Sequence, residues 1–227
     1  MTFMLATEHL NKITGHSRYE PSKQAFVDRI NGNNGKARQL RRPHILAQTL
    51  AQTLHECGGF KYTREIWGPT PAQRRYEGRK DLGNVYPGDG KRFSGRDFIQ
   101  TTGRDNYRAL TVWVRANVDP AGPDFEAHPE LLTSPEWLDI SVIWYFSVRV
   151  SMRYLEAGDI EMITRRVNGG LNGYRDRLNR YNRAALVILG YGRTQVRTFQ
   201  RDCKLTVDGI SGPKTRAMMY HKLRRMV

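Results

Sequence analysis

The sequence is poor in cysteine and has no apolar run long enough to cross a membrane. Its 227 residues include two cysteines, Cys57 and Cys203. They are too few and too far apart for a disulfide framework or a metal cluster, so we expect two free thiols and a reducing compartment. The most apolar stretch, residues 140–148, is far shorter than the roughly 20 residues that a bilayer span needs. We therefore expect no integral membrane segment.

Signals for metal binding and for secretion are also missing. His55 and Glu56 begin like the metalloprotease pattern His-Glu-x-x-His, but Gly59 stands where the second histidine is needed. We expect neither a metal nor another cofactor. The first ten residues lack the basic start and long apolar run of a secretion signal, so we expect synthesis in the cytoplasm.

Positive charge is what the sequence has in excess. Lys and Arg number 37 against 22 Asp and Glu, a net charge of +15, which attracts polyanions such as nucleic acid, anionic lipid or bacterial wall polymers. About half of this charge lies in residues 190–227. A nucleic-acid-binding protein is the alternative from a different class. No helix-turn-helix, zinc-finger or RNA-binding motif appears, so we expect no nucleic-acid partner; binding to duplex DNA that survives physiological salt would argue for one.

Apolar periodicity predicts an almost wholly helical chain. The expected helices run from Pro43 to the Gly58-Gly59 pair, over residues 137–150 with Ser134 as the N-cap, from Asp159 to Val167, and from Tyr174 to Leu189. The segment 137–150 is apolar nearly all round and is expected to be the central buried helix. Residues 68–95, rich in Gly, Pro, Asn and Asp, predict a long loop with room for a small hairpin.

Two glutamates nine residues apart, Glu56 and Glu65, are candidates for an acid and base pair. Glu56 falls in the last turn of an apolar helix, where burial and the negative helix end favour the protonated form. Glu65 follows the glycines in a polar region beside Trp67 and can stay ionised. Glycoside hydrolysis uses two carboxyl groups in contrasting environments. From the spacing alone, two solvated charges at helix ends are the simpler interpretation.

Four motifs, in this order, resemble glycoside hydrolase family 19, and most closely the phage endolysins of that family. They are His55-Glu56-Cys57-Gly58-Gly59, the stretch from Gly88-Asp89-Gly90 to Phe93, Gly95-Arg96 with Ile99-Gln100 and Thr102-Gly103-Arg104-x-Asn106-Tyr107, and Asn168-Gly169-Gly170-Leu171-Asn172-Gly173 with Asp176-Arg177. The resemblance covers about residues 1–189. It implies a mainly α, lysozyme-like fold of the family 19 chitinase type with a long loop or small hairpin.

The resemblance also implies roles for individual residues. Glu56 matches the general acid, Glu65 the base, and Thr102 the residue that helps to hold the attacking water. Residues that match positions lining the sugar cleft or supporting the acids are Gln100, Asn106, Asn168 and Arg177, and Tyr107 and Trp67 are further substrate-binding candidates. Asp97 departs from the pattern, because the family usually has glycine there. We expect either a different local backbone or an influence on neighbouring charges.

The basic tail is similar to the later part of the peptidoglycan-binding module of wall hydrolases. The matching residues are Val196, Phe199-Gln200, Leu205 to Ile210, Gly212-Pro213 and Thr215. We therefore predict a catalytic domain at 1–189 and a short helical, peptidoglycan-binding tail at 190–227.

Together these resemblances predict a monomeric, inverting endolysin that cleaves β-1,4 bonds of bacterial peptidoglycan. It would be made in the cytoplasm of the host bacterium and reach the wall through a holin-type membrane pore. The alternative within the enzyme class is a chitinase, because both polymers carry β-1,4-linked N-acetylglucosamine.

Overall fold

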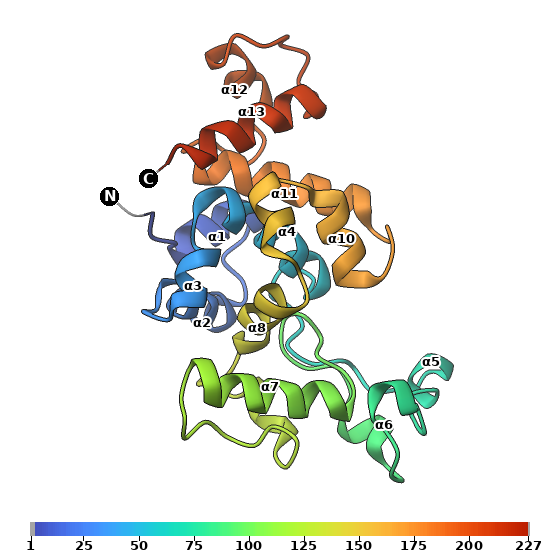
Figure 1. Ribbon diagram of the computed structural model, residues 1–227. Coiled ribbons are helices and arrows are strands. Elements are labelled where there is room, and N and C mark those ends of the chain that lie inside the picture. The colour runs from blue at the N-terminus through green and yellow to red at the C-terminus, as the bar shows by residue number, and fades with distance from the viewer. Residues whose placement is uncertain (1–2, 227) are drawn as a thin grey trace. The chain divides into compact units, whose positions relative to one another are not determined.

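The computed structural model describes residues 3–226, and the chain is mainly α-helical (Figure 1). Within this range there are thirteen α-helices and two 3-10 helices. Extended pairing between residues 3 and 226 is limited to two isolated antiparallel bridges, Arg64 with Arg96 and Arg96 with Thr101. The helical fold class predicted from the sequence is confirmed.

The helices fall into two compact units. The first combines the chain up to His55 with the chain from Phe146 onward, and the second spans Glu56–Tyr145. The first unit contains α1 (Thr7–Thr14), α2 (Glu20–Asn31), α3 (Gly35–Leu40), α9 (Met152–Ala157), α10 (Ile160–Asn168), α11 (Tyr174–Ile188), α12 (Val196–Asp202), α13 (Pro213–Arg224) and nearly all of α4 (Pro43–Glu56). The second contains α5 (Pro71–Arg74), η1 (Lys80–Leu82), α6 (Asp89–Arg92), α7 (Arg104–Asn117) and η2 (Pro129–Thr133), while α8 (Ile140–Val148) includes the boundary. The predicted boundary near residue 190 stays a prediction.

Three of the predicted helices, α4, α10 and α11, form where the sequence signals place them. Helix α4 starts at Pro43, whose fixed φ suits a first turn, and every residue from Pro43 to Leu54 is buried. The Asp159 side chain accepts a hydrogen bond from Met162 N at 3.0 Å and so caps α10. Gly169 ends α10 in the left-handed conformation, at a φ of 76°.

Helix α8 is shorter than predicted, and its N-terminus is capped differently. It begins at Ile140 instead of Trp137, because Asp139 adopts a left-handed φ of 76° that interrupts the helix. The predicted N-cap at Ser134 is wrong. The carboxylate of Asp97, from a distant segment of the chain, instead accepts hydrogen bonds from the backbone N–H groups of Asp139 and Ser141. The prediction of burial is correct for the first five residues of α8.

The segment 68–95, expected to be irregular, contains the short helices α5, η1 and α6. Two carboxylates organise it. Asp89, almost fully buried, accepts hydrogen bonds from Val85 N and Tyr86 N, both at 3.1 Å, and forms an ion pair with Arg104. Glu77 accepts hydrogen bonds from the backbone of Gly88 at 2.5 Å and of Gly90 at 2.8 Å. These carboxylate contacts connect residues up to 15 positions apart, so neither local propensity nor periodicity could reveal them.

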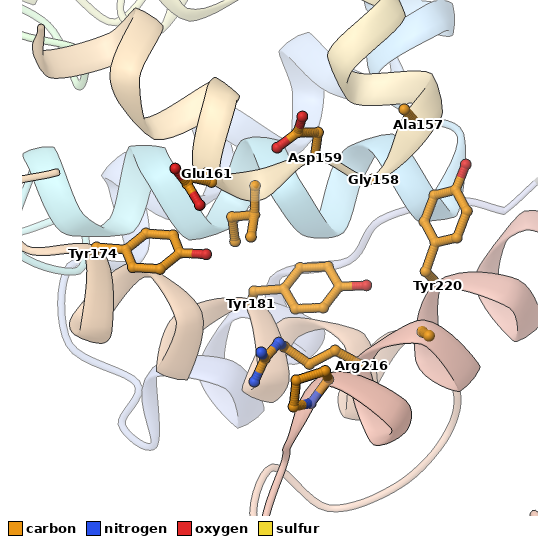
Figure 2. A pocket seen from close by; sticks show the side chains of 11 residues that line it. Ala157, Gly158, Asp159, Glu161, Tyr174, Tyr181, Arg216 and Tyr220 are labelled. Carbon is orange, nitrogen blue, oxygen red and sulfur yellow. The ribbon is translucent and has the colours of Figure 1, made fainter. Parts of the chain in front are cut away.

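The C-terminal tail is part of the first unit, and its helix α13 is in contact with α11 (Figure 1). The Tyr220 hydroxyl donates a hydrogen bond to Glu156 O, and Arg193 Nη1 donates one to Thr14 O at 2.9 Å. A pocket of about 410 Å³ remains beside this contact; Tyr174, Tyr181 and Tyr220 line it together with Asp159 and Glu161 (Figure 2).

Candidate active site

Glu56 is the last residue of α4 and is half-buried. Gly58, Gly59 and Phe60 follow with left-handed φ values of 59°, 74° and 71°, so the chain reverses immediately after this carboxyl group. The turn is fixed by the buried Cys57, whose Sγ accepts a hydrogen bond from Phe60 N at 3.1 Å and whose carbonyl accepts one from Tyr62 N. Glu56 is therefore carried by a buried helix and a tight turn, as a residue with a fixed catalytic position requires.

Glu65 accepts hydrogen bonds from three donors on two segments of the second unit. Its Oε2 accepts from Gly95 N at 3.0 Å, and its Oε1 accepts from Gln73 Nε2 at 3.0 Å and from Tyr76 OH at 3.4 Å. Its own backbone N–H donates to Gly95 O at 2.8 Å. This environment orients a carboxylate and matches its acceptor-only chemistry when it is ionised.

Gln73 and Tyr76 are the functional candidates that sequence reasoning missed. Gln73 is nearly fully buried; its Oε1 accepts hydrogen bonds from Gly68 N and Thr70 N, while its Nε2 donates to Glu65. The available signal was the pattern Thr70-x-x-Gln73, a capping box that the structure contains at the start of α5. Burial, followed by the nearby Glu65, raises the pKa of Tyr76, so its hydroxyl stays protonated and can donate to that carboxylate.

Gly95 is the point where three predicted site residues meet. Besides its two hydrogen bonds with Glu65, it lies against Gln100 and Thr102: a Cβ atom added at Gly95 would be 2.6 Å from Gln100 Oε1 and 3.3 Å from Thr102 Oγ1. Gln100 Nε2 donates to Asp97 O at 3.0 Å, and Thr102 Oγ1 donates to Gln100 O at 2.9 Å. Because the hydroxyl proton of Thr102 is already engaged, its oxygen can accept a hydrogen bond from a water molecule beside Gly95.

The close contacts at Gly95 make it a sensitive position. We expect Gly95→Ala to lower hydrolysis of the glycan substrate that the sequence resemblance predicts by roughly 10- to 100-fold, because the new methyl group displaces the Gln100 carboxamide from a site where a shift of about 1 Å is costly. The measurement is the initial rate of reducing-end release, with circular dichroism to verify folding. Gly35→Ala is the matched control, since no atom lies within 4 Å of its added Cβ. Full activity in the folded Gly95 variant would contradict this arrangement.

Two other candidates lie close to this group. Asn106, in the first turn of α7, donates from Nδ2 to Thr102 O at 2.7 Å and so fixes the backbone of Thr102. Trp67 is half-buried, with its ring 6.3 Å from that of Tyr76. Its indole therefore flanks the tyrosine that bonds to Glu65.

Tyr107 is not placed where it can touch a substrate. Its side chain is fully buried in the hydrophobic core of the second unit, and its hydroxyl donates to Ser94 O at 2.8 Å and accepts from Arg96 Nη1 at 2.9 Å. Burial raises its pKa to about 12. Its expected contact with substrate is therefore corrected to a structural role: it supports the segment 94–96 that contains Gly95.

Asn168 and Arg177 belong to the first unit. Arg177 is buried, and its Nη1 donates to Gln52 Oε1 at 2.6 Å, which joins α11 to α4. Asn168 Nδ2 donates to Asn172 O at 2.7 Å, and its Oδ1 accepts from Gly170 N at 2.8 Å. Arg177 therefore supports the helix that carries Glu56, whereas Asn168 shapes the loop after α10; substrate binding by Asn168 stays a prediction.

Asp97, where the family pattern has glycine, takes a backbone conformation that is uncommon for other residues. It has a left-handed φ of 64°, a conformation that glycine adopts readily and aspartate tolerates. Its side chain is fully buried, and its Oδ1 accepts from Phe98 N at 2.5 Å and Asp139 N at 2.8 Å, its Oδ2 from Ser141 N at 2.9 Å. Burial raises the pKa of Asp97 while these hydrogen bonds oppose the shift. The carboxyl group caps α8 instead of facing a substrate.

Among residues 3–226 there is no cluster of three or more His, Cys, Asp or Glu that could hold a metal ion. No helix in the same range is both long and apolar enough to span a membrane. The two cysteines are free, as predicted, and Cys57 is buried.

Comparison with known proteins identifies the family. The chain is 31% identical over 219 residues to a glycosyl hydrolase family 19 domain-containing protein of Haemophilus influenzae, an alignment that covers 82% of this chain and 98% of that protein. The chain belongs to glycosyl hydrolase family 19. Residues 192–219 of this family 19 protein also match the family model for peptidoglycan binding domains.

Solved structures agree with the fold of this family 19 chain. Chitinase C from Streptomyces griseus superposes with a TM-score of 0.58 at 18% identity, covering 84% of this chain and 95% of the chitinase. A second bacterial family 19 chitinase gives a TM-score of 0.54 at 18% identity, covering 82% and 95%. The fold is therefore that of family 19 chitinases, as the sequence predicted.

Proposed function

We propose that this family 19 protein hydrolyses β-1,4 glycosidic bonds of bacterial peptidoglycan. The observation that carries the proposal is the presence, in one chain, of a family 19 hydrolase fold and a peptidoglycan-binding match at residues 192–219. The net charge of +15 adds support, because peptidoglycan carries carboxylates and a basic protein concentrates near such a polymer.

Glu56 is the general acid of the proposed reaction, and Glu65 is the base. Glu56, at the end of a buried helix, protonates the glycosidic oxygen. Glu65 Oε2 accepts a single hydrogen bond from the described part of the chain, that of Gly95, so it has a free lone pair for the proton of an attacking water. Thr102 Oγ1 lies against the same glycine and holds that water. The three bonds to Glu65 keep its carboxylate in place while the proton is transferred.

This route predicts inversion at the anomeric carbon. A base that acts through water gives inversion, whereas a nucleophilic carboxylate gives retention through a covalent intermediate. We expect the first product of peptidoglycan cleavage to have the α configuration, as observed by proton NMR before mutarotation. Mass analysis of the same digest identifies the bond that is cut. A β-configured first product, or a glycosyl ester trapped on Glu65, would disprove the mechanism, and intact glycan strands would disprove the proposed function.

A chitinase is the second candidate, because the solved structures that share the fold are chitinases. The same digestion carried out on chitin separates the two. Products released faster from chitin than from peptidoglycan would favour the chitinase.

We further propose that the protein is a phage endolysin. The support is the resemblance of its motifs and of the nine-residue spacing between Glu56 and Glu65 to the endolysin branch of the family. In this role it is made in the cytoplasm of the host bacterium and acts on the wall after release through a holin-type pore.

A further inference from the structure

A groove lined by arginines lies where the tail meets α11. It has a volume of about 510 Å³ and is formed by one face of α11 and by two segments of the tail. We call it the arginine groove; its lining consists of Arg175, Leu178, Asn179, Asn182, Arg183, Arg193, Thr194, Val196, Gly209, Ile210, Ser211 and Arg216. Seven of these twelve residues fall within the segment 192–219 that matches peptidoglycan binding domains.

The charge of the arginine groove has one sign. Four of its lining residues are arginines, and none of them is acidic. Arg193 and Arg216 are partly engaged, since each donates one hydrogen bond to a backbone carbonyl. Arg175 and Arg183 are exposed on α11, and neither has a side-chain partner among residues 3–226. Their guanidinium groups are available to a ligand, and the forked geometry of a guanidinium matches a carboxylate.

The remaining lining indicates which anion fits. Leu178, Val196 and the 65% exposed Ile210 provide apolar surface, while Asn179 and Asn182 provide amides. A peptide with short apolar side chains and a free carboxylate uses all three kinds of group. The alternating charges and sugars of a wall phosphate polymer would leave the apolar surface without a partner.

The neighbouring pocket differs from the arginine groove in charge, because acidic residues line it. In Figure 2, Asp159 and Glu161 lie on one side of that pocket, with Tyr174 near Glu161, and Arg216 lies on the other side, next to Tyr181. The two carboxyl groups of that pocket repel a carboxylate ligand. Arg216 lines both hollows, so an anion attracted to it is favoured on the side of the arginine groove.

We propose that the arginine groove binds the free carboxylates of the peptide stems of peptidoglycan. The inference rests on the proposed function, because it takes peptidoglycan as the ligand. It adds the binding residues and the chemical group that they recognise. In this proposal the arginine groove binds the peptides of the wall, while the active site cleaves its glycan.

The test is a pelleting assay with the full chain and purified sacculi, stripped of phosphate polymers, at physiological salt. The double variant Arg175→Gln/Arg183→Gln should bind at least about tenfold more weakly, because it loses two charge-assisted contacts. Arg201→Gln/Arg225→Gln is the matched control: it removes the same charge from exposed tail positions outside the groove, and its affinity should stay within about twofold of the original.

A second test changes the sacculi chemically and uses the unaltered protein. Sacculi whose carboxylates have been converted to amides should bind the unaltered protein about as weakly as native sacculi bind the groove variant, with no further loss when both changes are combined. The inference is overturned if both double variants lose affinity equally, if amidation has no effect, or if binding requires the phosphate polymers. It is also overturned if duplex DNA binds with equal affinity at the same salt concentration.

Release of reducing ends from the same sacculi reports on the proposed function separately. Groove-dependent binding without any glycan cleavage would refute the hydrolase proposal and retain the groove. Cleavage with binding that is indifferent to Arg175 and Arg183 would refute the groove and retain the hydrolase.

Discussion

Glu56→Gln should reduce wall lysis by at least about 100-fold while the protein remains folded. The substitution keeps the shape of the side chain at the end of α4 but removes the proton that the leaving oxygen needs, and general acid catalysis contributes about 10²–10⁴ in rate. The rate is measured as loss of turbidity of a wall suspension, with circular dichroism and thermal unfolding recorded alongside.

The control for this loss is Glu130→Gln, an exposed glutamate of η2 in the same compact unit. It removes an equal charge and should leave the lysis rate unchanged. A folded Glu56→Gln protein that lyses walls at nearly the original rate would show that another residue supplies the proton.

Asp97→Asn should lower the free energy of unfolding measurably. Asparagine can still accept the hydrogen bonds of Phe98 and Asp139 through one oxygen, but its NH₂ group then faces the N–H of Ser141 in a fully buried site. Leaving a buried donor unsatisfied costs about 1–3 kcal/mol. For a chain of this size each kcal/mol lowers Tm by roughly 2–4 °C, which calorimetry can measure.

Asp81→Asn serves as the comparison for Asp97. Asp81 forms an exposed ion pair with Arg79 beside η1, and surface ion pairs contribute little to stability, so Tm should hardly change. Equal effects of the two substitutions would mean that Asp97 does not cap α8 as described.

Local chemistry explains why some elements could be predicted from the sequence. Asp159, which caps α10, and Gly169, which ends it, are the residues directly before and after this helix in the sequence. Helix α4 likewise starts at Pro43. The start of α8 could not be predicted in this way. Its cap, Asp97, is more than 40 residues away, and the interruption depends on the left-handed backbone of Asp139.

The candidate site also contains residues that the sequence predicts and residues that only the structure reveals. The sequence motifs pointed to Glu65, Gln100 and Thr102, and the structure places all three around Gly95. Motifs could not reveal that Gln73 and Tyr76 orient the Glu65 carboxylate, because these contacts depend on the path of a loop that contains short helices. They also could not reveal the complete burial of Tyr107, since its polar neighbours in sequence resemble those of a surface residue.

Helix α11 has two roles in the fold, and because one helix serves both, ligand binding at the tail is coupled to the stability of the first unit. It is a core helix of the first unit through Arg177 and Gln52, and it is also the surface against which α13 packs. A ligand that binds only when α11 and the tail are in place must therefore stabilise the folded form of that whole unit by mass action. An anchored molecule would then resist heat and proteolysis longer than a free one, with the gain set by the ratio of ligand concentration to Kd.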